Sequence, residues 1–274
     1  MTLDTPVALP ARAPPAGIVG FACFSIGIIA VLVVSAAAAE PISLNGSTTV
    51  INTLVRPHLA EIEAASGQQI VVTGNGSQRG LADLMAGKAH VAMISAPLEL
   101  EVDKINAKQP GAIDFVRLRA HVVGSARIVF AIHPDNPVRR LSPDQLTDIL
   151  VGKIGNWREV GGLDQRIIVV TAQPGDGLRT MVESALLPGR ALAKDARAMT
   201  NATQIAKVVA QVPGAIGIIA ATSLDSSVAE IKQGAALTTP LILVTIGDGT
   251  PLVRRVIDAI AKLGQFERGE AAMR

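Results

Sequence analysis

Hydroxyl-bearing turns recur in the first hundred residues of the chain, each directly after a short apolar run. The first turn carries Ser47, Thr48 and Thr49, the second Ser77 and the third Ser95. Each turn opens a helical pattern, and N–H groups in the first turn of a helix lack intrahelical partners and carry partial positive charge. Such N–H groups and hydroxyls bind small anions. The pattern therefore predicts an anion site built from several turns, or hydroxyls that only cap their own helices.

A fourth loop, Gly175-Asp176-Gly177, lies between an apolar run and a helical pattern, but it carries a carboxylate. Three interpretations of Asp176 stay open. It caps the helix and fills the anion position itself. It accepts hydrogen bonds from a ligand that has its own donors, such as a protonated oxyanion. Alternatively, Arg79 and Arg179 turn inward, neutralise Asp176 and restore anion binding, although both arginines can equally lie on solvated helix surfaces.

These turns require a particular arrangement of strands. Alternation of strand, turn and helix is typical of an α/β sheet, whose ligand lies at the carboxyl ends of the strands. Two extended runs, 115–123 and 127–132, are separated by Gly124-Ser125 and are suited to carry the chain from one lobe to another. We therefore predict an α/β fold with short strands at 42–45, 69–73, 90–94, 167–170 and 241–246, and a turn followed by a strand within 213–220.

Composition limits the classes of function. Of the 274 residues, 49% are apolar, which allows a sizeable core, whereas the net charge is only +2 and aromatic residues make up 2%. Because there is no basic stripe and no stacking surface, we expect no nucleic-acid partner. The sequence contains no Gly-x-Ser-x-Gly, no His-Glu-x-x-His and no P-loop, and its four histidines show no catalytic or metal-ligand spacing. We therefore expect a binding protein, not an enzyme, without metal or cofactor.

The first 39 residues differ in composition from the rest. An apolar run from about Ile18 to Val34 precedes Ala37-Ala38-Ala39, which fits the cleavage site of a signal peptide. The run approaches the ~20 residues that span a bilayer, so an uncleaved inner-membrane anchor is the alternative. The only cysteine, Cys23, lies in this run, so the exported part forms no internal disulfide. We predict export to a bacterial periplasm.

Several segments occur together in a fixed order along the chain. They are Gly46-Ser47-Thr48-Thr49-Val50, Gly76-Ser77-Gln78-Arg79-Gly80, Ser95-Ala96-Pro97-Leu98, Asn136-Pro137, the segment 152–162 and Gly214-Ala215-Ile216-Gly217. This set closely resembles the periplasmic phosphate-binding proteins of ABC importers. The resemblance implies a type II periplasmic-binding-protein fold, in which two α/β lobes joined by two hinge strands close over phosphate. It also implies a monomer that passes its ligand to an inner-membrane ABC permease.

The same resemblance sets the expected domain organisation. After the signal peptide or anchor at 1–39, residues 40–124 and 222–274 are expected to form one lobe, and residues 125–221 the other. Within the segment 152–162, the lone Trp157 is expected to anchor its loop structurally.

Site residues follow from the resemblance position by position. Thr48 or Thr49 corresponds to the first hydroxyl donor and Ser77 to the second, while Ser95 stands where relatives often place an aspartate. The candidate ligand-binding residues are Ser47, Thr48, Thr49, Ser77, Arg79, Ser95, Gly175, Asp176, Gly177 and Arg179.

The last loop departs from the family pattern Arg-x-x-Gly-Ser-Gly-Thr. Ala172 stands at the arginine, Asp176 at the serine and Leu178 at the threonine, so the loop loses a cation and two hydroxyls and gains a negative charge. Two like charges about 4 Å apart repel by roughly 4 kcal/mol at an effective dielectric near 20, which is about three decades of affinity. We therefore expect a binding protein for phosphate or a related small oxyanion or polar ligand. The alternative is a membrane-anchored sensor or scaffold that has lost phosphate binding.

Overall fold

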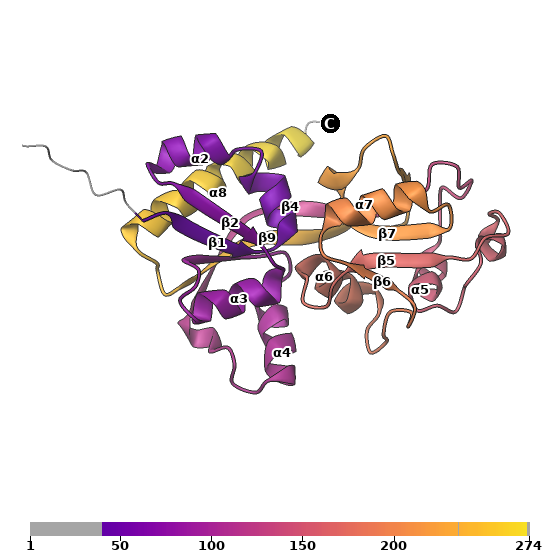
Figure 1. Ribbon diagram of the computed structural model, residues 1–274, viewed down its shortest axis with the longest axis horizontal. Coiled ribbons are helices and arrows are strands. Elements are labelled where there is room, and N and C mark those ends of the chain that lie inside the picture. The colour runs from indigo at the N-terminus through magenta and orange to yellow at the C-terminus, as the bar shows by residue number, and fades with distance from the viewer. Residues whose placement is uncertain (1–39, 235, 273–274) are drawn as a thin grey trace, which may run out of the picture. The chain divides into compact units, whose positions relative to one another are not determined.

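The computed structural model describes residues 40–234 and 236–272, and Figure 1 shows their helices and strands. The predictions for residues 1–39, which include the signal peptide and Cys23, lie outside the described residues. Within the described part of the chain, no helix combines the length and the hydropathy needed to cross a bilayer.

The first lobe alternates strand and helix, as the sequence predicts. Its elements are β1 (Ile42–Gly46), α1 (Thr48–Val50), a π-helical turn (Ile51–Val55), α2 (Leu59–Ser66), β2 (Ile70–Gly74), α3 (Ser77–Met85), β3 (Val91–Ile94) and α4 (Leu98–Lys108). β1 lies between β2 and β3 and is parallel to both, with Ile42 opposite Ile70 and Leu44 opposite Val91. The carboxyl ends of the three strands are therefore neighbours, which brings the turns after them to one edge of the sheet.

The second lobe repeats the alternation. Its elements are α5 (Pro143–Leu150), β5 (Ile168–Ala172), α6 (Gly177–Leu186), β6 (Arg197–Met199), α7 (Ala202–Gln211), β7 (Ala215–Ala220) and β8 (Ala229–Ile231). β5 pairs in parallel with β6 and β7. Helix α5 begins with the predicted capping box of Ser142 and Gln145. Trp157 is fully buried in a 3₁₀ turn (Trp157–Val160), and its Nε1 donates to the Gly214 carbonyl at 3.0 Å, which confirms its structural role.

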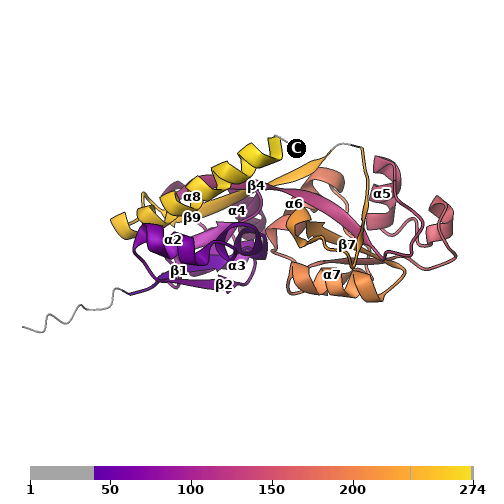
Figure 2. The ribbon, with the colours of Figure 1, turned by 90° about the horizontal axis from the view of Figure 1, so that it is seen from above.

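Two long strands, β4 (Leu118–Ile132) and β9 (Leu237–Ile246), run antiparallel beside each other through both lobes. Figure 2 shows β4 curving from the first lobe into the second. The sequence predicts two extended runs before and after Gly124, but the structure joins most of both into β4, because Gly124 stays extended within the sheet. Only Phe115–Arg117 departs from this strand, as a 3₁₀ turn.

The pairing of β4 with β9 is irregular at one place. Its register shifts between Val122 and Gly124, and the adjacent rung sets Ser125 opposite Pro240. In the described residues the sheet has the order β2-β1-β3-β9-β4-β7-β5-β6, and β8 pairs with β4. The irregular rung lies where the two lobes join, since Val123 packs in a first-lobe core cluster and Ile128 in a second-lobe cluster.

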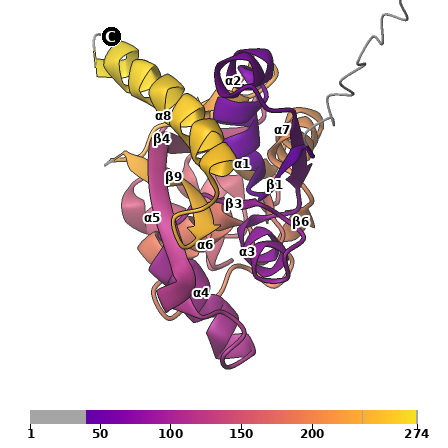
Figure 3. The same ribbon diagram turned by 90° about the vertical axis from the view of Figure 1, so that its left-hand side faces the viewer.

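Helix α8 (Pro251–Ala272) returns the chain to the first lobe. Figure 3 shows α8 across β4 and β9, with α2 beside it. Gly264 of α8 lies so close to the Val123 carbonyl that no side chain fits there. The expected lobe boundaries stay a prediction; Val228 and Ile231, which follow the predicted boundary at 222, pack in second-lobe clusters.

Candidate functional site

Three serines from separate turns lie together at the carboxyl ends of β1, β2 and β3. Ser47 Oγ donates a hydrogen bond to Ser95 Oγ at 2.8 Å, and the Ser95 N–H donates to Ser77 Oγ at 3.3 Å. Thr239 of β9 donates to the Ser95 carbonyl. All three serines are fully buried. In this conformation, the hydroxyls predicted to bind an anion contact one another and the backbone.

The first residue of α6, Gly177, packs on the three serines from the second lobe. A methyl group at position 177 would lie 2.7 Å from Ser95 Oγ and closer still to Ser77 Oγ, so only glycine fits. The start of α6 therefore covers the hydroxyls of the first lobe.

A backbone hydrogen bond joins the two lobes beside this contact. The N–H of Gln78, in the first turn of α3, donates to the Gly175 carbonyl at 3.0 Å. Gly76 and Gly175 face each other with φ of 91° and 93°, a conformation that side chains rarely allow. One N–H group that a bound anion would use is thus occupied by the protein's own backbone.

Asp176 is the N-cap of α6. Its Oδ1 accepts hydrogen bonds from the N–H groups of Leu178 at 3.0 Å and Arg179 at 3.4 Å. The side chain is buried, and burial raises its pKa, although these hydrogen bonds and the Arg179 charge oppose the rise. Asp176 therefore caps α6, and its carboxylate meets N–H groups that an anion would otherwise contact.

The two predicted arginines behave differently. Arg179 folds back along α6, where its Nε donates to Glu183 at 2.7 Å and its Nη1 to the Ala172 carbonyl at 3.1 Å. Burial alone would raise the pKa of Glu183, but hydrogen bonds from Arg179 and Lys104 lower it overall. Arg79, by contrast, is exposed and has no hydrogen-bond or ion-pair partner among the described residues.

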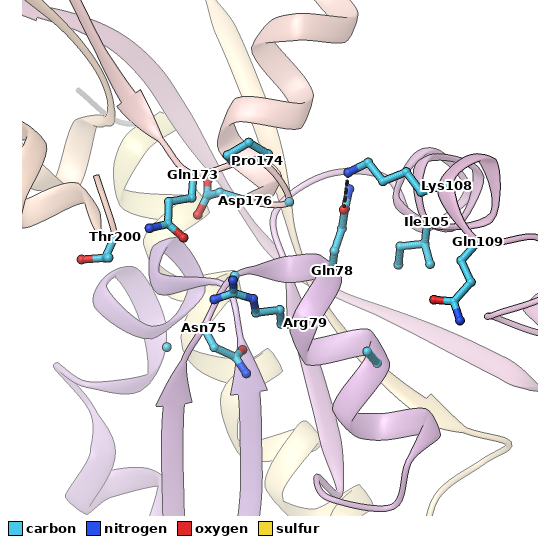
Figure 4. A pocket seen from close by; sticks show the side chains of 14 residues that line it. Asn75, Gln78, Arg79, Ile105, Lys108, Gln109, Gln173, Pro174, Asp176 and Thr200 are labelled. Carbon is cyan, nitrogen blue, oxygen red and sulfur yellow. Dashed lines mark hydrogen bonds between the residues drawn. The ribbon is translucent and has the colours of Figure 1, made fainter. Parts of the chain in front are cut away.

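A cavity of about 400 Å³, which we call the junction cavity, lies next to the Gln78–Gly175 contact. It is bounded by the turn after β2, the end of α4, the loop before α6 and Thr200. Figure 4 shows the side chains of Arg79, Lys108 and Asp176 around it. The junction cavity is thus lined by residues of both lobes and contains charged groups of both signs.

The predicted threonines lie elsewhere. Thr49 is buried, and Thr48 lines a separate cavity of about 410 Å³ together with Arg56 and Asn201. The structure therefore brings Ser47, Ser77, Ser95 and Gly177 into one cluster, and Arg79, Gly175 and Asp176 to the junction cavity. Thr48 and the Arg179 side chain belong to neither.

A family model described as a PBP superfamily domain matches residues 33–263. The chain belongs to the PBP superfamily. Among curated proteins, the phosphate-binding protein PstS of Bacillus subtilis (strain 168) is 27% identical over 237 residues, which cover 81% of this chain and 75% of PstS.

Solved structures of phosphate transport proteins are also similar to this chain. One is assigned as a phosphate ABC transporter substrate-binding protein with bound phosphate, from Clostridium perfringens; it is 25% identical with a TM-score of 0.70, over 81% of this chain and 93% of its own. Another is an ABC-type phosphate transport receptor from Vibrio cholerae, 25% identical with a TM-score of 0.61, over 83% of this chain and 96% of its own. The predicted family and α/β fold class are confirmed, and this PBP superfamily member is a divergent relative of phosphate-binding proteins.

One residue of this PBP superfamily site escapes sequence reasoning. Glu101 of α4 is fully buried at the junction, where its Oε2 accepts a hydrogen bond from Gln78 Nε2 at 3.1 Å and its Oε1 has no partner. Burial raises its pKa from 4.5 to about 7, and the nearby Asp176 charge adds to the rise. The available signal is its position in the helical series 98, 101, 102 and 105, which places Glu101 on the apolar face of α4.

An ion pair also links α4 of the first lobe to α6 of the second. Lys104 Nζ lies 2.9 Å from Glu183 Oε2, and both side chains are about three-tenths exposed, at 30% and 27%. Such partly solvated pairs contribute about 0.2–1 kcal/mol. The lobes of this PBP superfamily protein therefore hold each other through several contacts made by the chain itself.

Proposed function

We propose that this PBP superfamily protein is the solute-binding component of an ABC importer, and that it binds phosphate or a related small oxyanion or polar ligand between its lobes. One observation carries the proposal: the turns after β1, β2 and β3 meet the loop before α6 at a single junction. Ligands of open α/β sheets bind at the carboxyl ends of strands. The relatives that bind phosphate support the same ligand class. The proposed role is binding, not catalysis.

Access to the serine hydroxyls requires the lobes to part. Gly177 covers Ser77 and Ser95, and the Gly175 carbonyl occupies the Gln78 N–H, so a ligand at this position must replace contacts that the protein makes with itself. Opening at β4 and β9 would free these donors, and closure on a ligand would engage them again. The apparent dissociation constant would then equal the intrinsic one divided by the fraction of empty molecules that are open.

Asp176 sets a limit on the affinity for phosphate. Its carboxylate caps α6 beside the serine cluster, and Ala172 supplies no cation there. Repulsion of roughly 4 kcal/mol at about 4 Å would weaken phosphate binding by about three decades. We therefore expect the dissociation constant for phosphate to lie above the micromolar range.

Isothermal titration calorimetry of the protein with phosphate, sulfate and other oxyanions tests this function. We expect saturable binding of at least one anion, weakened by Ser77→Ala and unchanged by the control Ser226→Ala, an exposed serine in the turn before β8. If no anion binds, the proposed function is wrong. If phosphate binds with micromolar or tighter affinity, the function stands and the limiting role of Asp176 is wrong.

We also propose that the chain is exported to the periplasm with cleavage after Ala39. This proposal rests on the composition of residues 1–39 and on the relatives being transport receptors. The N-terminal sequence and intact mass of the protein recovered from a periplasmic extract test it. A mature protein that begins at Glu40 agrees with export, whereas a full-length chain in the membrane fraction supports the anchor and contradicts cleavage.

A further inference from the structure

The junction cavity is the open part of the interlobe contact. Its volume, about 400 Å³, falls within the range of small-molecule pockets, and a single phosphate ion fills only a small part of such a space. Both lobes line it: Arg79 and Lys108 come from the first and Asp176 from the second. A ligand held there would bridge the lobes.

The first-lobe wall of the junction cavity offers positive charge. Arg79 has no partner among the residues that the structure describes, and its guanidinium presents paired N–H donors that match phosphate geometry. Lys108 contributes a second cation, whose Nζ contacts Gln78 Oε1 at 3.4 Å. Two cations on one wall favour a doubly charged anionic group over a carboxylate.

The second-lobe wall offers negative charge. Asp176 uses only Oδ1 for the α6 N–H groups, and no described residue donates to its Oδ2. Arg179 does not form an ion pair with it, since the Arg179 guanidinium binds Glu183 and the Ala172 carbonyl. Burial disfavours the charge of this carboxylate, so a positive group placed beside it would be stabilised strongly.

We propose that the junction cavity binds a small phosphomonoester that carries an ammonium group, with its phosphate at Arg79 and Lys108 and its ammonium at Asp176. The inference rests on the proposed solute-binding function and names its ligand class. With Asp176 ionised, the three side chains sum to +1. A phosphomonoester carries about −1.5 to −2 at pH 7 and the ammonium +1, so the ligand's net charge balances that of the cavity.

O-phosphoethanolamine, ethyl phosphate and inorganic phosphate are the probes, titrated by calorimetry into the full chain. Ethyl phosphate has the phosphate and a similar size but no ammonium. We expect O-phosphoethanolamine to bind about tenfold or more tightly than ethyl phosphate, because only the former reaches Asp176. Equal affinities would overturn the assignment of Asp176 to an ammonium group.

Two variants test the contacts of the phosphate group and of the ammonium group separately. Arg79→Gln should weaken the binding of O-phosphoethanolamine and of ethyl phosphate alike, by about tenfold. It should not lower the stability of the protein, because Arg79 is exposed and unpaired in the described structure. Asp176→Asn keeps a good N-cap, and it should weaken the binding of O-phosphoethanolamine but not the binding of ethyl phosphate. The matched control is Arg255→Gln, an exposed arginine of α8 without a partner among the described residues, which should change neither affinity.

The outcomes distinguish this inference from the function on which it rests. If inorganic phosphate binds, is weakened by Ser77→Ala and is indifferent to Arg79→Gln, the solute-binding function stands and the ligand class proposed for the junction cavity is wrong. If none of the three probes and no other oxyanion binds, both proposals fail. Binding of O-phosphoethanolamine that responds to Arg79 and Asp176, but not to Arg255, supports both.

Discussion

The N–H of Gln78 donates to the carbonyl of Gly175 across the junction of the two lobes, at 3.0 Å. This hydrogen bond places a backbone oxygen of one lobe where the first turn of a helix in the other would receive an anion. Beside this hydrogen bond, Gly177 packs directly over Ser77 and Ser95. A ligand for the serine cluster therefore competes with the protein's own contacts, and its apparent affinity depends on how stable those contacts are.

Gly177→Ala should disrupt the closed junction. The added methyl group would lie 2.7 Å from Ser95 Oγ and closer to Ser77 Oγ, and overpacking of this kind costs about 1–3 kcal/mol. We expect a lower midpoint of thermal unfolding, or a larger radius of gyration in small-angle scattering if the lobes part instead. Gly155→Ala is the control, since a Cβ there meets nothing within 4 Å. A variant that matches the unmodified protein in both measurements would show that the contact is not tight.

Asp176→Ser should strengthen the binding of inorganic phosphate. Serine keeps the helix cap and removes the negative charge, so the dissociation constant should fall by about tenfold or more. Calorimetric titration measures the change, with Asp103→Ser, an exposed aspartate of α4, as the control. An unchanged affinity would mean that the missing cation at Ala172, and not Asp176, limits phosphate binding.

Stability should fall as the pH rises from about 4.5 to about 7. Burial holds the pKa of Glu101 near 7 in the folded protein, above the 4.5 of an ordinary glutamate. Between these values the unfolded chain has released a proton that the folded chain keeps, so the free energy of unfolding decreases by up to about 3 kcal/mol. Above pH 7 this contribution is constant. Gln78, Lys104, Asp176 and Thr180 are the groups that face Glu101.

Urea unfolding at a series of pH values measures this contribution. Glu101→Gln should flatten the difference between pH 4.5 and pH 7, since the neutral amide mimics the protonated carboxyl and can still accept from Gln78. Glu99→Gln, on the exposed side of the same helix, should leave the pH dependence as it is. Identical profiles for the unmodified protein and Glu101→Gln would contradict the raised pKa.

Trp157→Phe should lower stability without changing ligand affinity. The indole Nε1 donates to the buried Gly214 carbonyl, and loss of such a donor costs about 1–3 kcal/mol. Denaturant unfolding and calorimetric titration of the same variant check both parts. A changed affinity at unchanged stability would assign Trp157 to ligand binding instead of loop anchoring.

Much of the fold was predictable because its signals are local. Turns after short apolar runs mark the strand ends, and the capping box of Ser142 and Gln145 fixes the start of α5. The gathering of Ser47, Ser77 and Ser95 followed from the rule that the ends of neighbouring parallel strands share one sheet edge. These features depend on short stretches of chain or on general rules of topology.

The parts of the site that could not be predicted from the sequence depend on how the two lobes contact each other. No local pattern indicates that the Gly175 carbonyl meets the Gln78 N–H, or that Glu101 is buried against the start of α6. The partner of Arg179 was closer to prediction, since Glu183 lies four residues along the same helix. Contacts between residues far apart in sequence leave no periodic pattern, so the hydrogen bonds and buried charges of the junction became visible only in the three-dimensional structure.

The ribbon of β4 and β9 has a mechanical weak point. Its register shifts between Val122 and Gly124, and the next rung contains Pro240, which has no N–H to donate. Fewer ladder hydrogen bonds mean lower bending stiffness, and this rung lies between the core clusters of the two lobes. We therefore expect any rotation of one lobe against the other to bend the ribbon at this rung, so the position of the hinge axis is encoded in the chain and does not depend on the ligand.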